Sequence, residues 1–218
     1  MAAQKPTIAI LGGSGALGSG LARRWASAGY AVILGSREAA KAEQAAMSFG
    51  DGITGMDNEA AAAAGDIVVL TVPFAQQAMV LGAVKPALQG KILVDVTVPL
   101  VPPKVARVQL PAAGSAAQAA QTLLGEDVRV VSAFQNVAAA LLHEEGPIDC
   151  DILVCGNDKA ARATVLELVR DAGLRGFHGG PLANAAATEA LTSVLIFINK
   201  QYGAHAGIRI TGLADDAS

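Results

Sequence analysis

Large aromatic side chains and charges are both scarce in this 218-residue chain: aromatic residues make up 4% of it and charged residues 16%. Hydrophobic residues make up 52%, which excludes a disordered chain, because disordered chains have too little apolar surface to bury. The length suits one domain with a sizeable core, or one domain with a small appendage. Alanine and glycine replace the missing large side chains, which favours close packing of helices on a sheet.

Positive charge is not gathered anywhere along the chain, and the net charge is −3. No basic stripe is present that could neutralise a phosphate backbone, so we expect no nucleic-acid partner. The only cysteines, Cys150 and Cys155, lie five positions apart in an expected strand, so their side chains should point to opposite faces and not form a disulfide. With no other cysteine and no spaced His/Cys set, we expect no metal site.

Long apolar runs are also missing. The opening segment MAAQKPT is too short and too polar for a signal peptide. The longest unbroken apolar run late in the chain, residues 194–198, is too short to span a bilayer. We therefore expect a cytoplasmic protein with no membrane partner.

Short β-branched runs alternate with alanine-rich stretches of helical length. Most runs are apolar throughout, as in DIVVLTV, which is typical of strands covered on both faces. This alternation predicts an α/β fold, a Rossmann-type doubly wound parallel sheet with a small C-terminal α/β extension. The proline-rich segment 97–114 should not be helical. We expect strands at 7–12, 31–35, 66–72, 91–96, 128–133 and 151–155, a weaker strand at 174–178, and helices near 15–28, 37–49, 58–64, 74–88, 115–124, 158–172 and 184–200.

A glycine-rich turn follows the first expected strand in ILGGSGALGSGLA. Gly13, Gly15 and Gly18 form the pattern G-x-G-x-x-G between a strand and a helix, which is the context that a dinucleotide-binding motif needs. The first glycine permits a tight turn, the second lets the backbone approach a pyrophosphate, and the third lets the helix pack closely. The helix N-terminus also favours negative charge. The N–H groups facing the phosphates would be those of Gly15, Ala16 and Leu17.

The end of the second expected strand indicates which dinucleotide binds. NAD-binding proteins usually carry Asp or Glu there for the ribose hydroxyls, whereas this chain reads Gly35-Ser36-Arg37. Arg37 offers a planar fork to a 2′-phosphate, Ser36 offers a hydroxyl, and Lys41 lies one helical turn further on. Ser14, inside the glycine-rich turn, could reach the same phosphate. These residues predict an NADP(H) site.

The strand at 66–72 should end at the edge of the sheet where ligands bind. Thr71, Val72 and Pro73 would therefore contact the second ribose and the nicotinamide. Asp95 ends the next strand in the sequence. An aspartate in this position more often anchors a loop than acts as a catalytic acid.

No side chain is assigned a catalytic role. The two tyrosines, Tyr30 and Tyr202, do not form the Ser–Tyr–x–x–x–Lys set of short-chain dehydrogenases. The three histidines, His143, His178 and His205, lie in expected loops or near the C-terminus. A carbonyl reductase needs a positioned proton donor, whereas hydride exchange between two redox coenzymes depends mainly on alignment and exclusion of water. The scarcity of such groups favours transfer between coenzymes.

Longer segments carry a family resemblance. Many Rossmann enzymes have an opening block like ILGGSGALGSGLARRWASAGYAVILGSREAAKAEQAA. The C-terminal block is far more specific to one family; it reads GGPLANAAATEALTSVLIFINKQYGAHAGIRIT. Between them come ITGMDNEAAAAAGDIVVLTVPF, KILVDVTVPL, GSAAQ, VVSAF and DILVCGND, in the same order. Nearly the whole chain resembles the NADP-dependent oxidoreductases that use the deazaflavin coenzyme F420. The resemblance implies reversible hydride transfer between NADP(H) and F420.

The resemblance also implies where the second coenzyme binds. The deazaflavin would stack over the nicotinamide between alanine-rich walls, which let two flat rings approach within hydride range. Gln135 stands where this family leads us to expect a histidine, and its amide could hydrogen-bond the deazaflavin rim without carrying a charge. The cleft would be formed by Val98, Pro99, Val137, Ala139 and the backbone near Ala206 and Gly207.

On this interpretation, residues 1–135 form the NADP-binding Rossmann domain, and residues 136–218 form a smaller part that completes the deazaflavin cleft and makes a dimer contact. The helix expected at 184–200 is apolar nearly all round between Ala190 and Ile198, so it must be buried from more than one side. It is either a homodimer contact or a central helix of a single core.

Two other functions stay open at this point. One is an NADPH-dependent reductase of another flavin, a quinone, or a small imine or carbonyl substrate. The other is a non-catalytic NADP-sensing module that would present the 184–200 helix to a partner. The physiological direction of hydride transfer is also open, because both directions use the same site.

Overall fold

The computed structural model describes residues 5–213. Within them, eight strands form one sheet in the order β3-β2-β1-β4-β5-β6-β7-β8. β1 to β6 run parallel, whereas β7 runs antiparallel to β6 and parallel to β8. The strands are β1 (Ile8–Leu11), β2 (Val32–Ser36), β3 (Ile53–Asp57), β4 (Ile67–Leu70), β5 (Ile92–Asp95), β6 (Arg129–Ser132), β7 (Asp151–Gly156) and β8 (Arg175–Gly180).

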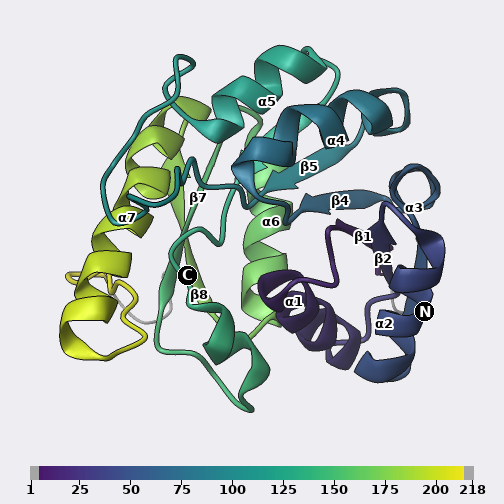
Figure 1. The fold of residues 1–218 in the computed structure, drawn as a ribbon, viewed down its shortest axis with the longest axis horizontal. Helices are drawn as coiled ribbons and strands as arrows, with labels where there is room; N and C mark the ends of the chain where they lie inside the picture. Colours follow the sequence, from purple (N-terminus) through teal and green to yellow (C-terminus); the bar gives the residue numbers. More distant parts are fainter. Residues whose placement is uncertain (1–4, 214–218) are drawn as a thin grey trace.

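Helices cover both faces of the sheet (Figure 1). One face carries α1 (Ala16–Ser27), α2 (Ala39–Phe49) and α6 (Lys159–Asp171). The other carries α3 (Asn58–Ala64), α4 (Phe74–Leu88) and α5 (Ala116–Leu124). The last helix, α7 (Ala185–Tyr202), lies at one end of the molecule beside α5 and β7. Two short 3₁₀ helices, η1 (Ala139–His143) and η2 (Leu182–Asn184), complete the described elements.

The predicted α/β fold is confirmed, and each predicted strand and helix agrees with an observed one to within two residues at either end. Two features differ. The strand β3 is not predicted, because its sequence ITGMD is half polar and contains glycine. The sheet is also not parallel throughout, since it reverses at β7. The predicted boundary at residue 135 falls in the connection before β7, and the strands on its two sides belong to the same sheet.

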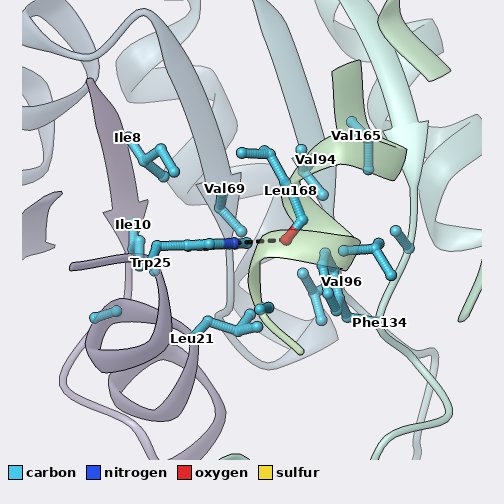
Figure 2. Packing of buried hydrophobic residues seen from close by; sticks show 14 of the residues in the cluster. Ile8, Ile10, Leu21, Trp25, Val69, Val94, Val96, Phe134, Val165 and Leu168 are labelled. Carbon is cyan, nitrogen blue, oxygen red and sulfur yellow. Dashed lines mark hydrogen bonds between the residues drawn. The ribbon is translucent and has the colours of Figure 1, made fainter. Parts of the chain in front are cut away.

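Trp25 lies at the centre of the packing between α1 and the sheet (Figure 2). Its side chain is fully buried, and its Nε1–H donates a hydrogen bond of 2.8 Å to the carbonyl of Leu168 on α6. Its ring meets that of Phe134 edge to face, with centroids 5.8 Å apart. These contacts hold α1, and the glycine-rich turn before it, against the rest of the fold.

The helix α7 keeps an apolar face in solvent. Val194, Phe197 and Tyr202 are 46%, 58% and 76% exposed. The alternative that this helix is central to the core is therefore wrong. By length and composition alone, the segment Leu182–Tyr202 would also suffice to cross a membrane. Glu189 within it is fully buried and accepts hydrogen bonds from backbone N–H groups at the start of α5.

Candidate functional site

The carboxyl ends of β1, β2, β4, β5 and β6 meet at one edge of the sheet. In the strand register Leu11 lies beside Gly35 and Leu70, Leu70 beside Asp95, and Asp95 beside Ser132. The segments that follow these strands therefore emerge side by side, at the edge where open α/β sheets bind ligands. They hold most of the predicted site residues.

The glycine-rich turn is shaped by close backbone packing. Gly12, just ahead of the motif, has a φ of +78°, and the Gly13 N–H donates to the Ile10 carbonyl at 3.2 Å within the turn. A Cβ on Gly12 would lie 2.7 Å from Cγ1 of Val72, and one on Gly18 would lie 2.8 Å from Cα of Gly13. A Cβ on Gly15 would meet nothing nearer than 3.5 Å. Of these three glycines, Gly15 is the one at which a Cβ would make only an ordinary contact, so its backbone is the least enclosed and the most accessible to a pyrophosphate.

The N-terminus of α1 suits an anion. Among the described residues, side chains cap α3, α5 and α6 but not α1, α2, α4 or α7, and α1, which begins at Gly15, has no acidic residue in its first turn. The Gly15 N–H, one of the three predicted phosphate donors, instead donates to the Gly12 carbonyl at 3.1 Å. The first helical N–H groups, those of Ala16 and Leu17, have no acceptor within the helix and can bind a phosphate.

The packing of Gly18 makes a directional prediction. Gly18→Ala should weaken NADPH binding, because the added methyl group would push the turn backbone away from its position. Gly82→Ala is the matched control: Gly82 lies within α4 with nothing within 4 Å of a Cβ, so alanine should raise the free energy of unfolding by about 0.4–1 kcal/mol. Isothermal titration with NADPH and urea denaturation measure the two effects. Unchanged NADPH affinity in Gly18→Ala would contradict this role of Gly18.

A cavity of about 500 Å³ adjoins the end of β2. Asn58 lies in its wall, and its Oδ1 is buried without a hydrogen-bond partner in the described chain. A carboxamide, which both donates and accepts, matches the edge of an adenine base, and apolar neighbours suit its faces. The cavity is lined by Ser36, Arg37, Asp57, Asn58, Glu59, Met79, Val80 and Ala83.

The predicted 2′-phosphate residues divide into two groups. Ser36 and Arg37 both line this cavity, and Arg37 is exposed at its mouth. Lys41 is instead paired with Glu38, at 2.6 Å between Nζ and Oε1, and both side chains are largely exposed. Ser14 is exposed in the glycine-rich turn. Of these side chains, Arg37 is the best placed cation for a phosphate.

The predicted nicotinamide residues follow β4. The Thr71 hydroxyl donates to the carbonyl of Leu11 at 3.0 Å, so it ties the end of β4 to the end of β1. Val72 packs on Gly12, and Pro73 occupies the N-cap position of α4. The segment Thr71–Pro73 therefore lies against the glycine-rich turn, as a contact with the same dinucleotide requires.

Asp95 is a loop anchor, the favoured interpretation of its position. It is fully buried and accepts hydrogen bonds from Gln77 Nε2 at 2.6 Å and from the Thr97 N–H at 2.9 Å. Burial raises the pKa of Asp95 to about 6, although these hydrogen bonds limit the rise. Gln135 Nε2 donates to the Asp95 carbonyl and to Ser132 Oγ, both at 2.8 Å, while its Oε1 is buried without a partner in the described chain.

Buried carboxyl groups should make the protein less stable as pH rises. Burial raises the pKa of Glu189 to about 8, aided by the nearby Asp95 and opposed by two backbone N–H groups. A carboxyl group whose pKa is higher in the folded state stabilises fully below its unfolded pKa, near 4, and loses this contribution as pH rises through the folded pKa. Urea denaturation should therefore give a lower free energy of unfolding at about pH 9 than at about pH 5. Glu189→Gln should flatten this dependence; an unchanged slope would contradict the pKa shift of Glu189.

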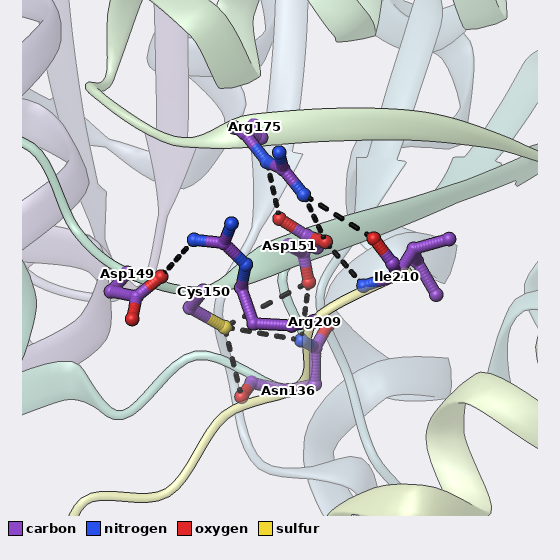
Figure 3. Close-up of polar contacts among 7 residues, drawn as sticks. All are labelled: Asn136, Asp149, Cys150, Asp151, Arg175, Arg209 and Ile210. Carbon is purple, nitrogen blue, oxygen red and sulfur yellow. Dashed lines mark hydrogen bonds and ion pairs between the residues drawn. The ribbon is translucent and has the colours of Figure 1, made fainter. Parts of the chain in front are cut away.

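The segment after α7 returns to β7 and is fixed there by Asp151 (Figure 3). The Asp151 N–H donates to the Ile208 carbonyl at 2.8 Å, and the Ile210 N–H donates to Asp151 Oδ2 at 2.6 Å. Arg175 pairs with the same carboxylate through Nε at 2.8 Å and Nη2 at 2.9 Å. Arg209 pairs with Asp149 beside it.

Cys150 joins two walls of the predicted deazaflavin cleft. A Cβ on Gly207 would lie 2.5 Å from the Cys150 sulfur. Asn136 Nδ2 donates to the same sulfur at 3.3 Å and to the Asp151 carbonyl at 2.7 Å. The segments that contain Val137 and Gly207 therefore both pack against the buried Cys150 thiol. Cys150 and Cys155 are both free thiols, as predicted.

The remaining cleft residues lie in neighbouring segments. Val98 and Pro99 follow β5, beside the segment that follows β6. Ala139 begins η1, which packs against α1. The N–H of Ala206 donates to Asn199 Oδ1 at 2.6 Å, which ties the C-terminal segment to α7. These residues thus come from the segments after β5, after β6 and after α7.

Residues 7–99 match the family model described as NADP oxidoreductase coenzyme F420-dependent. The chain is 41% identical over 221 residues to the F420-dependent NADP reductase of Methanocaldococcus jannaschii, covering 94% of this chain and 98% of that protein. It belongs to the F420-dependent NADP oxidoreductase family. A second F420-dependent NADP reductase, from Methanothermobacter marburgensis, is 40% identical and covers 95% of this chain and 99% of that protein.

Solved structures agree with the fold of this family member. The protein SMa0349 from Sinorhizobium meliloti superposes with a TM-score of 0.72 at 27% identity, covering 84% of this chain and 88% of that one. An imine reductase variant from Myxococcus stipitatus, solved with NAD⁺, has a TM-score of 0.63 at 22% identity, covering 92% of this chain and 62% of that one. The second likeness concerns the Rossmann fold alone.

Proposed function

We propose that this chain transfers a hydride reversibly between NADP(H) and the deazaflavin coenzyme F420. The main support is the similarity to F420-dependent NADP reductases, which extends over nearly the full length of this chain and of those proteins. In the direction of F420 reduction, NADPH loses a hydride, and F420 gains that hydride and one proton from solvent. Both coenzymes are substrates of the reaction.

The first task of the protein is to bind NADP(H) in one orientation. The uncapped N-terminus of α1 and the accessible backbone of Gly15 support a pyrophosphate there. Ser36 and Arg37 support the 2′-phosphate, and the cavity with Asn58 supports the adenine. The segment Thr71–Pro73 then directs the nicotinamide end toward β5 and β6.

The second task is alignment of the two rings. Asp95 is buried and hydrogen-bonded within the protein, so it anchors its loop and does not exchange protons with a substrate. Catalysis then depends on holding the rings close together and excluding water, which fits the apolar walls at Val98, Val137 and Gly207.

An acceptor comparison tests this function against the two alternatives. NADPH oxidation should be fast with F420 and negligible with FMN, quinones, imines or carbonyl compounds. Fast turnover of one of those acceptors instead would support a different reductase. Tight NADPH binding without turnover of any acceptor would support a nucleotide-sensing module.

A homodimer through α7 also belongs to the proposal. Val194 and Phe197 expose an apolar face on this helix, and such a face favours association in water. We expect light scattering to give twice the 21.9 kDa mass of one chain. Phe197→Glu should give the monomer mass, whereas Met79→Glu, on an exposed position of α4, should not change the dimer. A monomeric parent protein would contradict this interface.

The protein should act in the cytoplasm. The burial of Glu189 against α5 supports this, since it indicates a helix that belongs to a folded domain. Fractionation of cells that produce the protein would test this; recovery in the membrane fraction would contradict it.

A further inference from the structure

A closed series of polar contacts surrounds the carboxyl ends of β5 and β6, and it begins and ends on α7. The Glu189 carboxylate accepts from the Ala116 N–H at 2.6 Å and from the Ala117 N–H at 3.0 Å, at the start of α5. Gln77 Nε2, on α4, donates both to the Ala116 carbonyl at 3.1 Å and to the Asp95 carboxylate at 2.6 Å. These bonds connect α7 to the loop that leaves β5.

The second half of the series returns to α7. The Asp95 carbonyl accepts from Gln135 Nε2 at 2.8 Å. The Gln135 carbonyl in turn accepts from the Thr192 hydroxyl at 2.8 Å, one helical turn after Glu189. The side chains of Gln77, Asp95, Gln135 and Glu189 are all buried. The helices α4, α5 and α7 and the segments after β5 and β6 are thereby fixed to one another beside the proposed cleft.

A buried glutamate at position 189 is energetically unfavourable if its only role is packing. Removing a carboxyl group from water is unfavourable, and an apolar side chain of similar volume often packs as well or better. The helix α5 also has its own cap, because Ser115 Oγ accepts from the Gln118 N–H at 3.0 Å. What Glu189 supplies is a directional connection from α7, through α5 and α4, to the Asp95 loop.

We propose that Glu189 is a positioning residue for hydride transfer, which holds the loop after Asp95 and the segment after Gln135 at the spacing that the two coenzymes require. This inference rests on the proposed function. The loop after Asp95 leads to Val98 and Pro99, and the segment after Gln135 leads to Val137. The positions of both walls of the acceptor cleft therefore depend on the same series of hydrogen bonds. The NADP side, at the glycine-rich turn and Arg37, lies outside the series.

Glu189→Gln tests the inference at about pH 9, above the Glu189 pKa of about 8, where the parent side chain is ionised. The substitution keeps the size of the side chain but places an NH₂ group where a second N–H acceptor is needed. Single-turnover mixing of NADPH-loaded enzyme with F420 should show hydride transfer slowed about 10- to 100-fold, since a misplacement of about 1 Å can cost about 100-fold. The Kd of NADPH, measured by fluorescence titration, should stay within about two-fold of the parent value, as expected for a distant site.

Thr188→Val is the matched control. Thr188 precedes Glu189 and is also buried, but its hydroxyl contacts the Ala185 carbonyl of its own helix, at 3.2 Å, and the Cys155 thiol of β7, and is no member of the series. This variant should keep both the hydride-transfer rate and the Kd of NADPH. An equal loss in Thr188→Val would show that any buried change in α7 has the same effect, and would overturn the role of Glu189.

Gln77→Asn tests the same connection from α4, in case Glu189→Gln does not fold. The shorter amide cannot reach both Ala116 and Asp95, so hydride transfer should slow again. In the double variant the loss should not exceed the larger single loss, because both changes break one connection. Parent-like transfer in either single variant would overturn this inference alone, whereas a parent enzyme that does not reduce F420 would overturn the proposed function itself.

Discussion

Arg37→Ala is expected to raise the KM for NADPH at least about ten-fold, as for the loss of a charge-assisted phosphate contact of about 1.5–3 kcal/mol. Arg37 lines the cavity at the end of β2 and is exposed at its mouth, with Ser36 beside it. The KM for NADH, which has no 2′-phosphate, should change little. Steady-state kinetics with both nucleotides and F420 measure the difference.

Lys41→Ala is the control for charge alone. Lys41 is exposed and already paired with Glu38, so its removal should raise the KM for NADPH less than Arg37→Ala does. Equal effects of Arg37→Ala on NADPH and NADH would contradict the 2′-phosphate assignment. A larger effect of Lys41→Ala than of Arg37→Ala would transfer that assignment to Lys41.

Trp25→Ala is expected to lower the free energy of unfolding by about 3–5 kcal/mol, as for truncation of a large buried aromatic side chain. Trp25 is fully buried between α1 and α6, contacts Phe134 edge to face, and donates to the Leu168 carbonyl. Because Trp25 is the only tryptophan in the sequence, urea unfolding should be followed by circular dichroism rather than by fluorescence.

Trp25→Phe separates the hydrogen bond from the packing. Phenylalanine retains much of the ring but loses the Nε1–H donor, while the Leu168 carbonyl keeps its bond from the Ala172 N–H at 3.0 Å. The lost hydrogen bond should therefore cost about 0.5–1.5 kcal/mol. A loss in Trp25→Phe as large as that in Trp25→Ala would show that the hydrogen bond, and not the packing, carries the stability. A loss below about 1 kcal/mol in Trp25→Ala would contradict the central position of this side chain.

The fold was largely predictable from sequence because its strands are buried on both faces and read as continuous apolar runs. The glycine pattern and the Ser36–Arg37 pair were predictable for the same reason, since each directly follows such a strand. Asn58 was not predictable in this way. It follows β3, whose half-polar sequence ITGMD does not read as a buried strand, so nothing marked Asn58 as lying at the ligand edge.

The contacts of Glu189 were beyond sequence reasoning for a different reason. Its partners, Ala116 and Ala117, are more than 70 residues away, and they bond through backbone N–H groups that any residue other than proline could supply. In the sequence Glu189 is a single carboxylate beside an apolar stretch. Only the packing of α7 on α5 shows that it is buried and bonded.

Direct transfer of isotope between the two coenzymes tests the central claim most directly. Purified protein would be mixed with F420 and NADPH that carries deuterium at the transferred position, and the reduced F420 would be analysed by mass spectrometry. One deuterium per reduced F420 is expected, because the site aligns two rings and places no exchanging group between them. Reduced F420 without deuterium, or no reduction of F420 by NADPH, would contradict direct hydride transfer in this site.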